Sequence, residues 1–196
     1  MVASSTIAEL DRLLSLVTWT SPEAFLAADA PLLAPVWRTL LTTDGSTTLF
    51  LQALCGAPIS LELIDQQTAP LPPMVTAWLQ HQPDRPVLQR RVWLTDGRHR
   101  LAIGYTFIMS ERFSPALQKR LASGTLPIGL LADELKLPSV RDCLQVGRLA
   151  DPALARQFGA AENQLWCRRY RLHIPDVMTA AIIEIFSPSL DTRPAP

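Results

Sequence analysis

The sequence predicts an α+β fold, in which helices pack on one side of a single antiparallel β-sheet. Segments with an apolar period of two are joined by tight turns, and segments of helical period gather at the N-terminus and in one central insertion. A parallel Rossmann arrangement would instead alternate strand and helix throughout. The length of 196 residues fits one domain, at residues 1–196. Within it we expect a helical N-terminal extension at residues 1–40 and a loose tail at residues 191–196.

The composition is that of a chain with a well-filled core. Hydrophobic residues make up 48% and charged residues 18%, which excludes a disordered chain. Basic and acidic residues balance at 18 each, so the chain has no general attraction to nucleic acid or anionic lipid, and no basic patch spans a predicted helix face. No apolar run approaches the roughly 18 residues of a bilayer span. The N-terminus carries Glu9 and Asp11 and lacks the basic region of a secretory signal. We therefore expect a cytoplasmic protein with no membrane span and no nucleic-acid partner.

The first third of the chain is predicted to be helical. A capping box at Thr6 and Glu9 precedes leucines at helical spacing. A second helix begins at Ser21, because serine caps a helix and the proline after it fits the first helical position. Two further short helices are expected at Pro31–Leu41 and Ser46–Leu54.

From residue 58 onward the apolar period changes to two. Ile59, Leu61 and Leu63 alternate with polar residues, as in a half-buried strand. The pair Asp96-Gly97 predicts a hairpin, since glycine readily adopts the positive φ that such a turn requires. The other elements expected are a short helix or loop between the prolines at 69–73 and 83–86, hairpin strands at Val87–Thr95 and His99–Met109, helices at Ser114–Gly124 and Pro127–Leu135, and strands at Val140–Gly147, Leu165–Ile174 and Val177–Phe186, the last two joined by a tight turn at Pro175-Asp176.

The sequence contains no recognisable metal or cofactor motif. Cys55, Cys143 and Cys167 are widely spaced and form no CxxC pair, and the three histidines are scattered without HExxH. There is no GxGxxG and no P-loop sequence. We expect neither a metal nor an organic cofactor, and we interpret the cysteines as small buried hydrophobic residues in a reducing compartment.

Two charged residues lie where strand alternation predicts an apolar surface. Glu184 lies in a strand with apolar residues on both faces, where an ionised carboxylate is costly unless it is paired. It is either a carboxyl group in a pocket or the partner of a neighbouring arginine. Arg90 shares a face with Val92 and Leu94, so it should meet an anion, which is either a ligand or a protein carboxylate.

Other polar segments are less specific. Arg91 falls on the opposite face of its strand from Arg90 and is expected to be solvated. The run LWCRRYRL carries three arginines, of which one can point inward while at least two form a basic solvent face. The turn Thr42–Ser46 leads into a helix whose N-terminal N–H groups can receive an anion or simply be capped.

In this order the segments resemble chorismate lyases, and the resemblance runs from about Leu40 to Leu190. The segments that carry it are the turn Asp44-Gly45-Ser46-Thr47-Thr48, the arginine-led strand into Asp96-Gly97, Pro127-Ile128-Gly129, Gln145-Val146-Gly147-Arg148, the run LWCRRYRL and the final strand IIEIFSPSL. The Asp44-Gly45-Ser46 turn and the N-terminal extension look most like the cyanobacterial branch.

The resemblance implies an activity. Members of that family split chorismate into 4-hydroxybenzoate and pyruvate without a metal or organic cofactor, which supplies head groups for plastoquinone- or ubiquinone-type quinones. Their fold is an antiparallel sheet with helices on one side. Aromatisation drives the reaction, so the protein need only orient and polarise its substrate. Base-assisted and concerted proton removal both remain open.

The resemblance also implies site residues. With a one-residue deletion before Asp96-Gly97, the family's carboxylate-binding arginine falls on Arg90. The glutamate beside the 4-hydroxyl group falls on Glu184, so Arg90 and Glu184 are the expected catalytic residues. The backbone amides that help to hold the ring carboxylate fall on Thr47 and Ile128.

One arginine of the family has no counterpart. It would lie near Gly104-Tyr105, so the enolpyruvyl carboxylate must be held by another group. Arg148, or an arginine of the LWCRRYRL run, is the expected replacement.

A non-catalytic alternative has the same fold. Effector-binding domains of some bacterial transcription regulators resemble these segments, but a winged-helix domain precedes them. Only about forty residues precede the shared region here, without a basic recognition helix. We expect a monomer whose partners are chorismate and 4-hydroxybenzoate.

Overall fold

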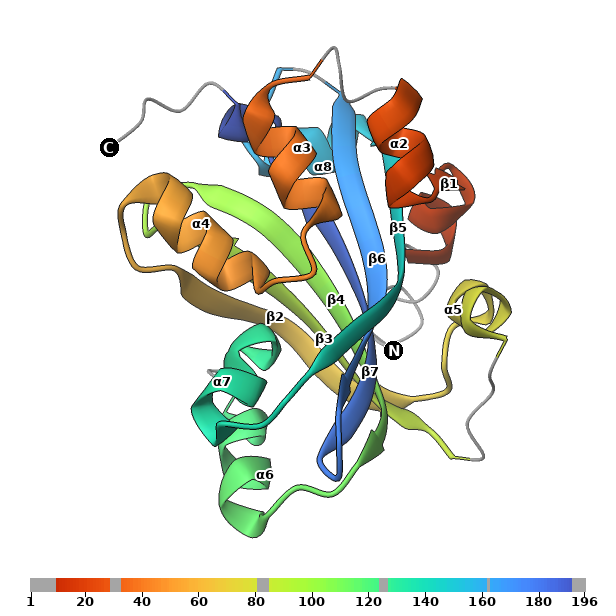
Figure 1. Ribbon diagram of the computed structural model, residues 1–196, viewed down its shortest axis with the longest axis vertical. Coiled ribbons are helices and arrows are strands. Elements are labelled where there is room, and N and C mark those ends of the chain that lie inside the picture. The colour runs from red at the N-terminus through yellow and green to blue at the C-terminus, as the bar shows by residue number, and fades with distance from the viewer. Residues whose placement is uncertain (1–9, 29–32, 81–84, 124–126, 162, 192–196) are drawn as a thin grey trace.

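Seven antiparallel strands form one twisted sheet in the computed structural model (Figure 1), which describes residues 10–28, 33–80, 85–123, 127–161 and 163–191. The strand order is β1-β5-β6-β7-β4-β3-β2, so β1 and β2 are the two edges. The strands are β1 (Thr18–Thr20), β2 (Ser60–Ala69), β3 (Val87–Thr95), β4 (Arg100–Glu111), β5 (Val140–Ala150), β6 (Gln164–Ile174) and β7 (Met178–Phe186).

The main group of helices lies on one side of the sheet, which confirms the predicted α+β class. This group contains α2 (Pro22–Ala28), α3 (Pro35–Thr42), α4 (Thr47–Cys55), α6 (Pro115–Ala122), the 3-10 turn η2 (Ile128–Leu130) and α7 (Leu131–Leu135). Short helical segments also cover the opposite face, namely residues 10–15, α5 (Pro73–Leu79) and α8 (Pro152–Gln157). A last turn, η3 (Pro188–Leu190), follows β7. No helix in the described ranges is both long enough and apolar enough to cross a bilayer.

The local signals of the sequence are confirmed at several helix starts. The Ser21 side chain accepts a hydrogen bond from the backbone of Ala24, and Ser46 caps α4 through the backbone N–H of Leu49. The hairpin at Asp96-Gly97 joins β3 and β4, with Gly97 at a φ of 87°. The predicted capping box at residues 6–9, the helix start at residues 31–32, the helix end at residue 124 and most of the tail lie outside the described residues.

Some features differ from the predictions. The strand at β2 is less buried than its alternation indicates, because it is an edge strand with a register shift between Leu63 and Asp65, and Leu63 is 39% exposed. Cys143 is exposed rather than buried, whereas Cys167 is buried. Neither β1 nor α8 was predicted. Asp151 followed by a proline is a helix-start signal, from which α8 could have been predicted.

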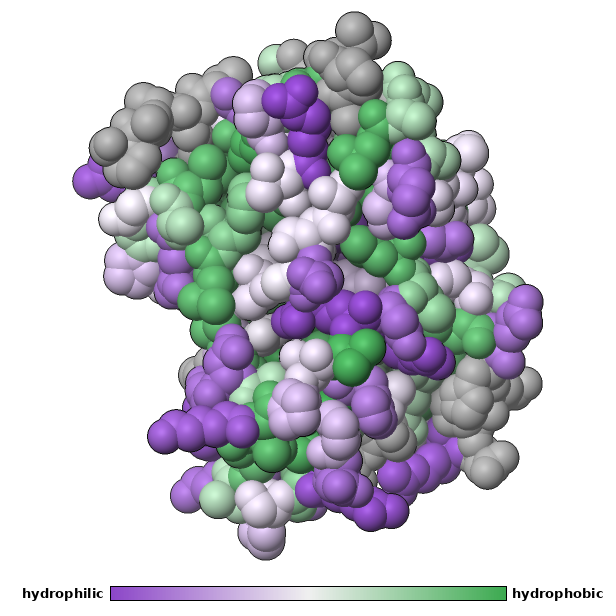
Figure 2. All heavy atoms as spheres, in the orientation of Figure 1, coloured by the Kyte–Doolittle hydropathy of each residue, from purple (hydrophilic) through white to green (hydrophobic). Residues whose placement is uncertain are grey.

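The register of the central strands brings two rows of side chains together on the helix-covered face. One row crosses β3, β4, β7 and β6 through Arg90, Thr106, Ile182 and Tyr170. The next row crosses the same strands through Val92, Gly104, Glu184 and Arg168. Figure 2 shows hydrophilic side chains across the middle of the molecule, over β5. An ion pair between Arg171 on β6 and Asp142 on β5 links these two strands.

Candidate active site

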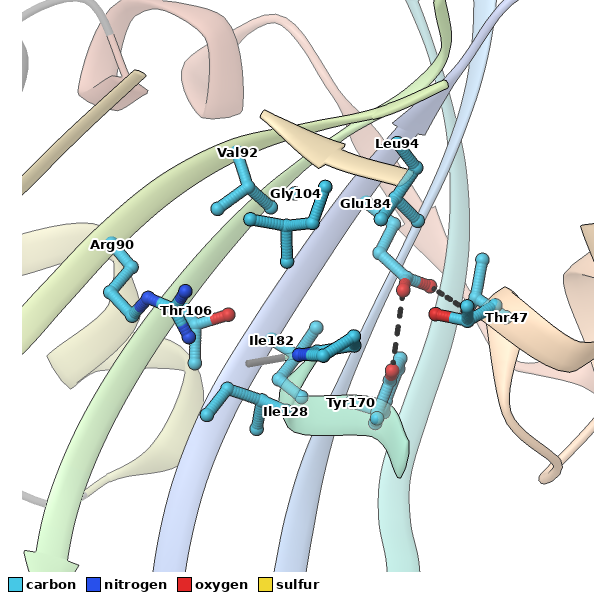
Figure 3. A pocket seen from close by; sticks show the side chains of 14 residues that line it. Thr47, Arg90, Val92, Leu94, Gly104, Thr106, Ile128, Tyr170, Ile182 and Glu184 are labelled. Carbon is cyan, nitrogen blue, oxygen red and sulfur yellow. Dashed lines mark hydrogen bonds between the residues drawn. The ribbon is translucent and has the colours of Figure 1, made fainter. Parts of the chain in front are cut away.

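A pocket lies where these two rows face α4 and η2 (Figure 3). Its lining encloses about 490 Å³ of space outside the atoms, part of it open to solvent. Arg90 stands at one end, and Glu184 stands at the other beside Thr47 and Tyr170. The other lining residues are small or apolar: Thr48, Leu61, Val92, Leu94, Gly104, Thr106, Pro127, Ile128, Gly129 and Ile182. The pocket is therefore apolar in the middle and charged at both ends.

Arg90 is buried at its end of the pocket, with 3% of its surface exposed. Arg90 lies two strands away from β7 and, along the strand direction, two residues away from Glu184. At ordinary strand spacing this separates the Cα atoms of Arg90 and Glu184 by about 12 Å. Burial lowers the pKa of Arg90 to about 10, so the guanidinium stays charged at neutral pH. A buried guanidinium facing an apolar cavity is a strong site for a ligand carboxylate.

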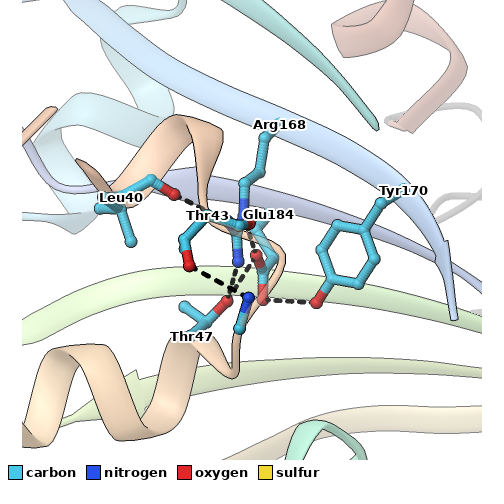
Figure 4. Close-up of polar contacts among 7 residues, drawn as sticks. Leu40, Thr43, Thr47, Arg168, Tyr170 and Glu184 are labelled. Atoms are coloured by element: carbon cyan, nitrogen blue, oxygen red, sulfur yellow. Dashed lines mark hydrogen bonds and ion pairs between the residues drawn. The ribbon is translucent and has the colours of Figure 1, made fainter. Parts of the chain in front are cut away.

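Glu184 is held on one side by a buried polar network (Figure 4). Its Oε2 accepts hydrogen bonds from Arg168 Nε at 2.8 Å and from Thr47 Oγ1 at 2.8 Å. The Tyr170 hydroxyl donates to the other oxygen, Oε1, at 3.4 Å. Since Oε2 is fully engaged, Oε1 is the oxygen that can accept a hydrogen bond from a ligand.

Arg168 has no exposed surface, and its donors are committed to the protein. Beyond Glu184, it donates to the backbone oxygens of Leu40 at 2.7 Å and Thr43 at 2.9 Å, and to Thr47 Oγ1 at 2.5 Å. Burial alone would lower the pKa of Arg168, but the charge of Glu184 and the contact with Tyr170 raise it. The guanidinium therefore stays charged, and it joins the α3–α4 connection to the carboxylate.

Tyr170 is a neutral hydrogen-bond donor in this setting. Burial, followed by the charge of Glu184, raises its pKa to about 12. The ring lines the pocket and contacts two guanidinium groups, those of Arg168 at 5.1 Å and Arg141 at 5.9 Å from its centroid.

Two helix starts also face the pocket. Thr47 is the first residue of α4, and Ile128 is the first residue of η2, which packs against α4. The first N–H groups of a helix have no acceptor within that helix. Backbone donors at Ile128 and, at the Glu184 end of the pocket, at Thr47 can therefore contribute to binding an anion.

The structure thus brings together four of the five predicted site residues: Arg90, Glu184, Thr47 and Ile128. The fifth, Arg148, does not line this pocket. It is exposed on β5, lies over the Trp166 ring at 4.7 Å, and lines a second cavity beside α2. The register explains this, because Arg148 pairs with Trp166, two residues along β6 from Arg168.

Two other arginines, Arg91 and Arg169, are less exposed to solvent than the sequence predicts. Arg91 pairs with Asp65 at 2.8 Å and is only partly exposed. Arg169 is buried on the opposite face, between Trp19 and Trp78. Only Arg171, of the LWCRRYRL run, is substantially exposed, and Arg168 points inward.

Sequence reasoning did not assign a role to Tyr170, Gly104 or Thr106. Alternation placed Tyr170 on the same face as Arg168, which was the available signal. Gly104 forms part of the pocket floor, and its missing side chain leaves space between Val92 and Glu184. Within the described ranges, no group of three or more metal-ligating side chains is found.

An open antiparallel sheet that encloses a small pocket with charges at both ends defines a domain that binds small molecules. A family model described as chorismate pyruvate-lyase Rv2949c-like matches residues 41–193. The chain therefore belongs to this Rv2949c-like chorismate pyruvate-lyase family.

Other similarities agree with the fold and the family. A protein of Cyanophora paradoxa described as uncharacterized protein ycf21 is 25% identical over 160 residues, which cover 82% of this chain and 81% of that protein. The effector domain of PhnF from Mycobacterium smegmatis has a TM-score of 0.56 and 16% identity, covering 74% of this chain and 90% of that chain. The structure of full PhnF from the same organism also has a TM-score of 0.56 and 16% identity, and the match covers 76% of this chain and 66% of that chain. At this identity the two PhnF structures show a common fold alone.

Proposed function

We propose that the protein is a chorismate lyase that converts chorismate to 4-hydroxybenzoate and pyruvate. The observation that carries this proposal is the pocket in which buried Arg90 and Glu184 face each other across an apolar middle. A ring with a carboxylate at one end and a hydroxyl group at the other matches this arrangement. Membership of the lyase family supports the same substrate.

The residues would act mainly by orientation. Arg90 would bind the ring carboxylate in bidentate fashion, with the backbone amide of Ile128 as a further donor. The Thr47 amide lies at the Glu184 end of the pocket, away from this carboxylate. Glu184 would accept a hydrogen bond from the 4-hydroxyl group through Oε1. A carboxylate fixed in this way does not have to reorganise as charge moves in the transition state.

The proposed reaction is an elimination that releases enolpyruvate from the ring. The bond between ring C3 and the ether oxygen breaks, the C4 proton leaves, and the ring becomes aromatic 4-hydroxybenzoate. The departing enolpyruvate takes up a proton and becomes pyruvate. Because aromatisation makes the reaction downhill, the protein would contribute mainly a positioned acceptor at Glu184 and an anchored ring at Arg90.

The proposal extends to the wider setting of the reaction. The product would serve as a head-group precursor for a plastoquinone- or ubiquinone-type quinone. The protein would act without a cofactor, as a cytoplasmic monomer with one domain at residues 1–196.

A second candidate function is ligand binding without catalysis. The fold shared with the PhnF effector domain favours it. So does the engagement of Glu184 by Arg168 and Thr47, which gives the carboxylate a structural role of its own. Such a module would bind the same class of ligand, an aromatic hydroxy acid, and release it unchanged.

One experiment separates the two functions. Purified protein is mixed with chorismate, and 4-hydroxybenzoate is followed by chromatography while pyruvate is followed by a coupled reduction. We expect equal amounts of both products, with a rate that EDTA does not change. Binding of 4-hydroxybenzoate without turnover would favour the effector module. Calorimetry showing no binding at millimolar ligand would contradict both functions.

A further inference from the structure

The substrate of the proposed reaction carries two carboxylates, whereas Arg90 is the one basic side chain among the described residues that line the pocket. Arg168 and Glu184 neutralise each other, since they are joined by a 2.8 Å ion pair. Arg90 balances the ring carboxylate at the far end of the pocket. The enolpyruvyl carboxylate therefore needs a further cation.

Most arginines of the strands are placed where they cannot serve. Arg91 and Arg171 are paired with aspartates, and Arg100 and Arg169 stack on tryptophans of the opposite face. Arg148 faces the second cavity. Apart from Arg90 and Arg168, this leaves Arg141.

Arg141 lies beside the pocket and is held only weakly. It is half-buried near the start of β5, opposite Leu172. Its NH2 group donates to the backbone oxygen of Gly129 at 3.4 Å, close to the outer limit of a hydrogen bond. Its Nε atom is buried and has no hydrogen-bond partner among the described residues. Its guanidinium lies 5.9 Å from the centroid of the Tyr170 ring.

The position of Arg141 fits the shape of chorismate. Gly129 and Tyr170, which both contact the Arg141 guanidinium, line the pocket. Tyr170 also contacts Glu184, at the end where the 4-hydroxyl group would bind. The enolpyruvyl group is attached at C3, next to the carbon that bears that hydroxyl. Its carboxylate would therefore lie at the Glu184 end, near Arg141 and far from Arg90.

We infer that Arg141 binds the enolpyruvyl carboxylate, and so selects dicarboxylate ligands over monocarboxylates. This inference rests on the proposed function for the identity of the ligand. The weak bond to the Gly129 oxygen would be exchanged for a charge-assisted bond to the substrate. A planar guanidinium suits a carboxylate better than an ammonium group does.

The test uses two stable aromatic ligands that differ in one carboxylate. These are 4-hydroxy-3-methoxybenzoate and 3-(carboxymethoxy)-4-hydroxybenzoate, and binding is measured by calorimetry. The parent protein should prefer the dicarboxylate. Arg141→Gln should weaken binding of the dicarboxylate about 10- to 100-fold, which corresponds to the loss of a hydrogen bond to a charged group. The same substitution should change the Kd of the methoxy ligand by less than about twofold, the deviation usual for an uncoupled site.

Further variants make the outcome decisive. Arg141→Lys should restore part of the preference, and Arg100→Gln, a matched change on the opposite face, should leave both affinities unaltered. With chorismate, Arg141→Gln should raise KM more than it lowers kcat.

Three results would overturn the inference: a parent protein without preference for the dicarboxylate, equal weakening of both ligands by Arg141→Gln, or a selective loss in Arg148→Gln instead. Equal weakening would show that Arg141 acts only by holding Gly129. If Arg141→Gln removes the preference for the dicarboxylate but the parent protein does not convert chorismate, the proposed function is contradicted and the selection of dicarboxylates by Arg141 stands.

Discussion

Replacing Glu184 by glutamine should damage stability and catalysis in the same variant, through separate causes. The structure gives Glu184 both roles that its position in the strand allowed, since it lines the pocket and neutralises Arg168. Glu184→Gln leaves a fully buried guanidinium without its counter-charge. Breaking a buried pair in this way costs about 3–5 kcal/mol. For a chain of this size, that corresponds to a fall in Tm of about 6–20 °C.

The catalytic loss is measured on the molecules that remain folded. Glutamine keeps the size of the side chain but offers a neutral acceptor, so the substrate hydroxyl group would lose its charged partner. We expect a fall of about 10²–10⁴ in the single-turnover rate, the range for a positioned acid or base. The measurement is made well below the melting range, with binding of 4-hydroxybenzoate as the check that the pocket persists.

A double-mutant cycle isolates the ion pair. In an Arg168→Gln background, Glu184→Gln should cost less than about 1 kcal/mol, because no buried charge is left unpaired. Urea midpoints of the four proteins give the coupling free energy. A Glu184→Gln protein that melts within about 2 °C of the parent would refute the ion-pair argument. Near-normal turnover would remove Glu184 from the mechanism and leave orientation by Arg90 as the source of rate.

Three further predictions concern single positions. Arg90→Ala should remove about 2–4 kcal/mol of transition-state stabilisation and so lower kcat/KM for chorismate about 30- to 1000-fold. Arg91→Ala, the control, should change kcat/KM little, and the reverse order would show that Arg91 faces the ligand. Gly104→Ala should keep the Tm, because the new Cβ would lie 3.4 Å from the Val92 side chain, yet weaken 4-hydroxybenzoate by roughly tenfold or more in calorimetry. Asp151→Ala removes the cap of α8 and should cost about 1–2 kcal/mol at pH 7 by urea unfolding. Burial raises the pKa of Asp151, but hydrogen bonds from the α8 backbone and an arginine outweigh this and lower it, so the difference from the parent should shrink as pH falls below about 4.

Much of the site could be predicted because its parts depend on short-range rules. The Ser46 cap fixes the start of α4 and so places Thr47 at a helix N-terminus. Alternation along β3 and β7 places Arg90 and Glu184 on strands whose apolar neighbours predict burial. These rules need no information from the rest of the chain.

The partner of Glu184 could not be predicted, because it depends on one residue in a turn. A two-residue turn at Pro175-Asp176 would pair Ile174 with Val177 and set Glu184 opposite Cys167. The observed turn contains three residues, pairs Ile174 with Met178, and sets Glu184 opposite Arg168. A shift of one residue exchanges the two faces of a strand, so the identity of the ion pair rests on that turn.

Arg141 was missed for a related reason. Strict alternation along β5 would put Arg141 and Arg148 on opposite faces. The register shift between Asp142 and Gln145, with Cys143 at a φ of 54°, changes the parity of the strand. Arg141 is consequently opposite Leu172, on the helix-covered face beside Tyr170, and sequence periodicity gives no sign of it.

The buried guanidinium of Arg168 links the fold to the proposed chemistry more directly than any other group in the site. It fixes the Glu184 carboxylate on the sheet and the oxygens of Leu40 and Thr43 ahead of α4. It also contacts Thr47, the first residue of α4, which lines the Glu184 end of the pocket. One side chain therefore positions donors and acceptors that come from opposite walls of the pocket. A substitution at Arg168 should displace both walls together, so its effect on catalysis should exceed what the loss of one hydrogen bond to Glu184 would explain.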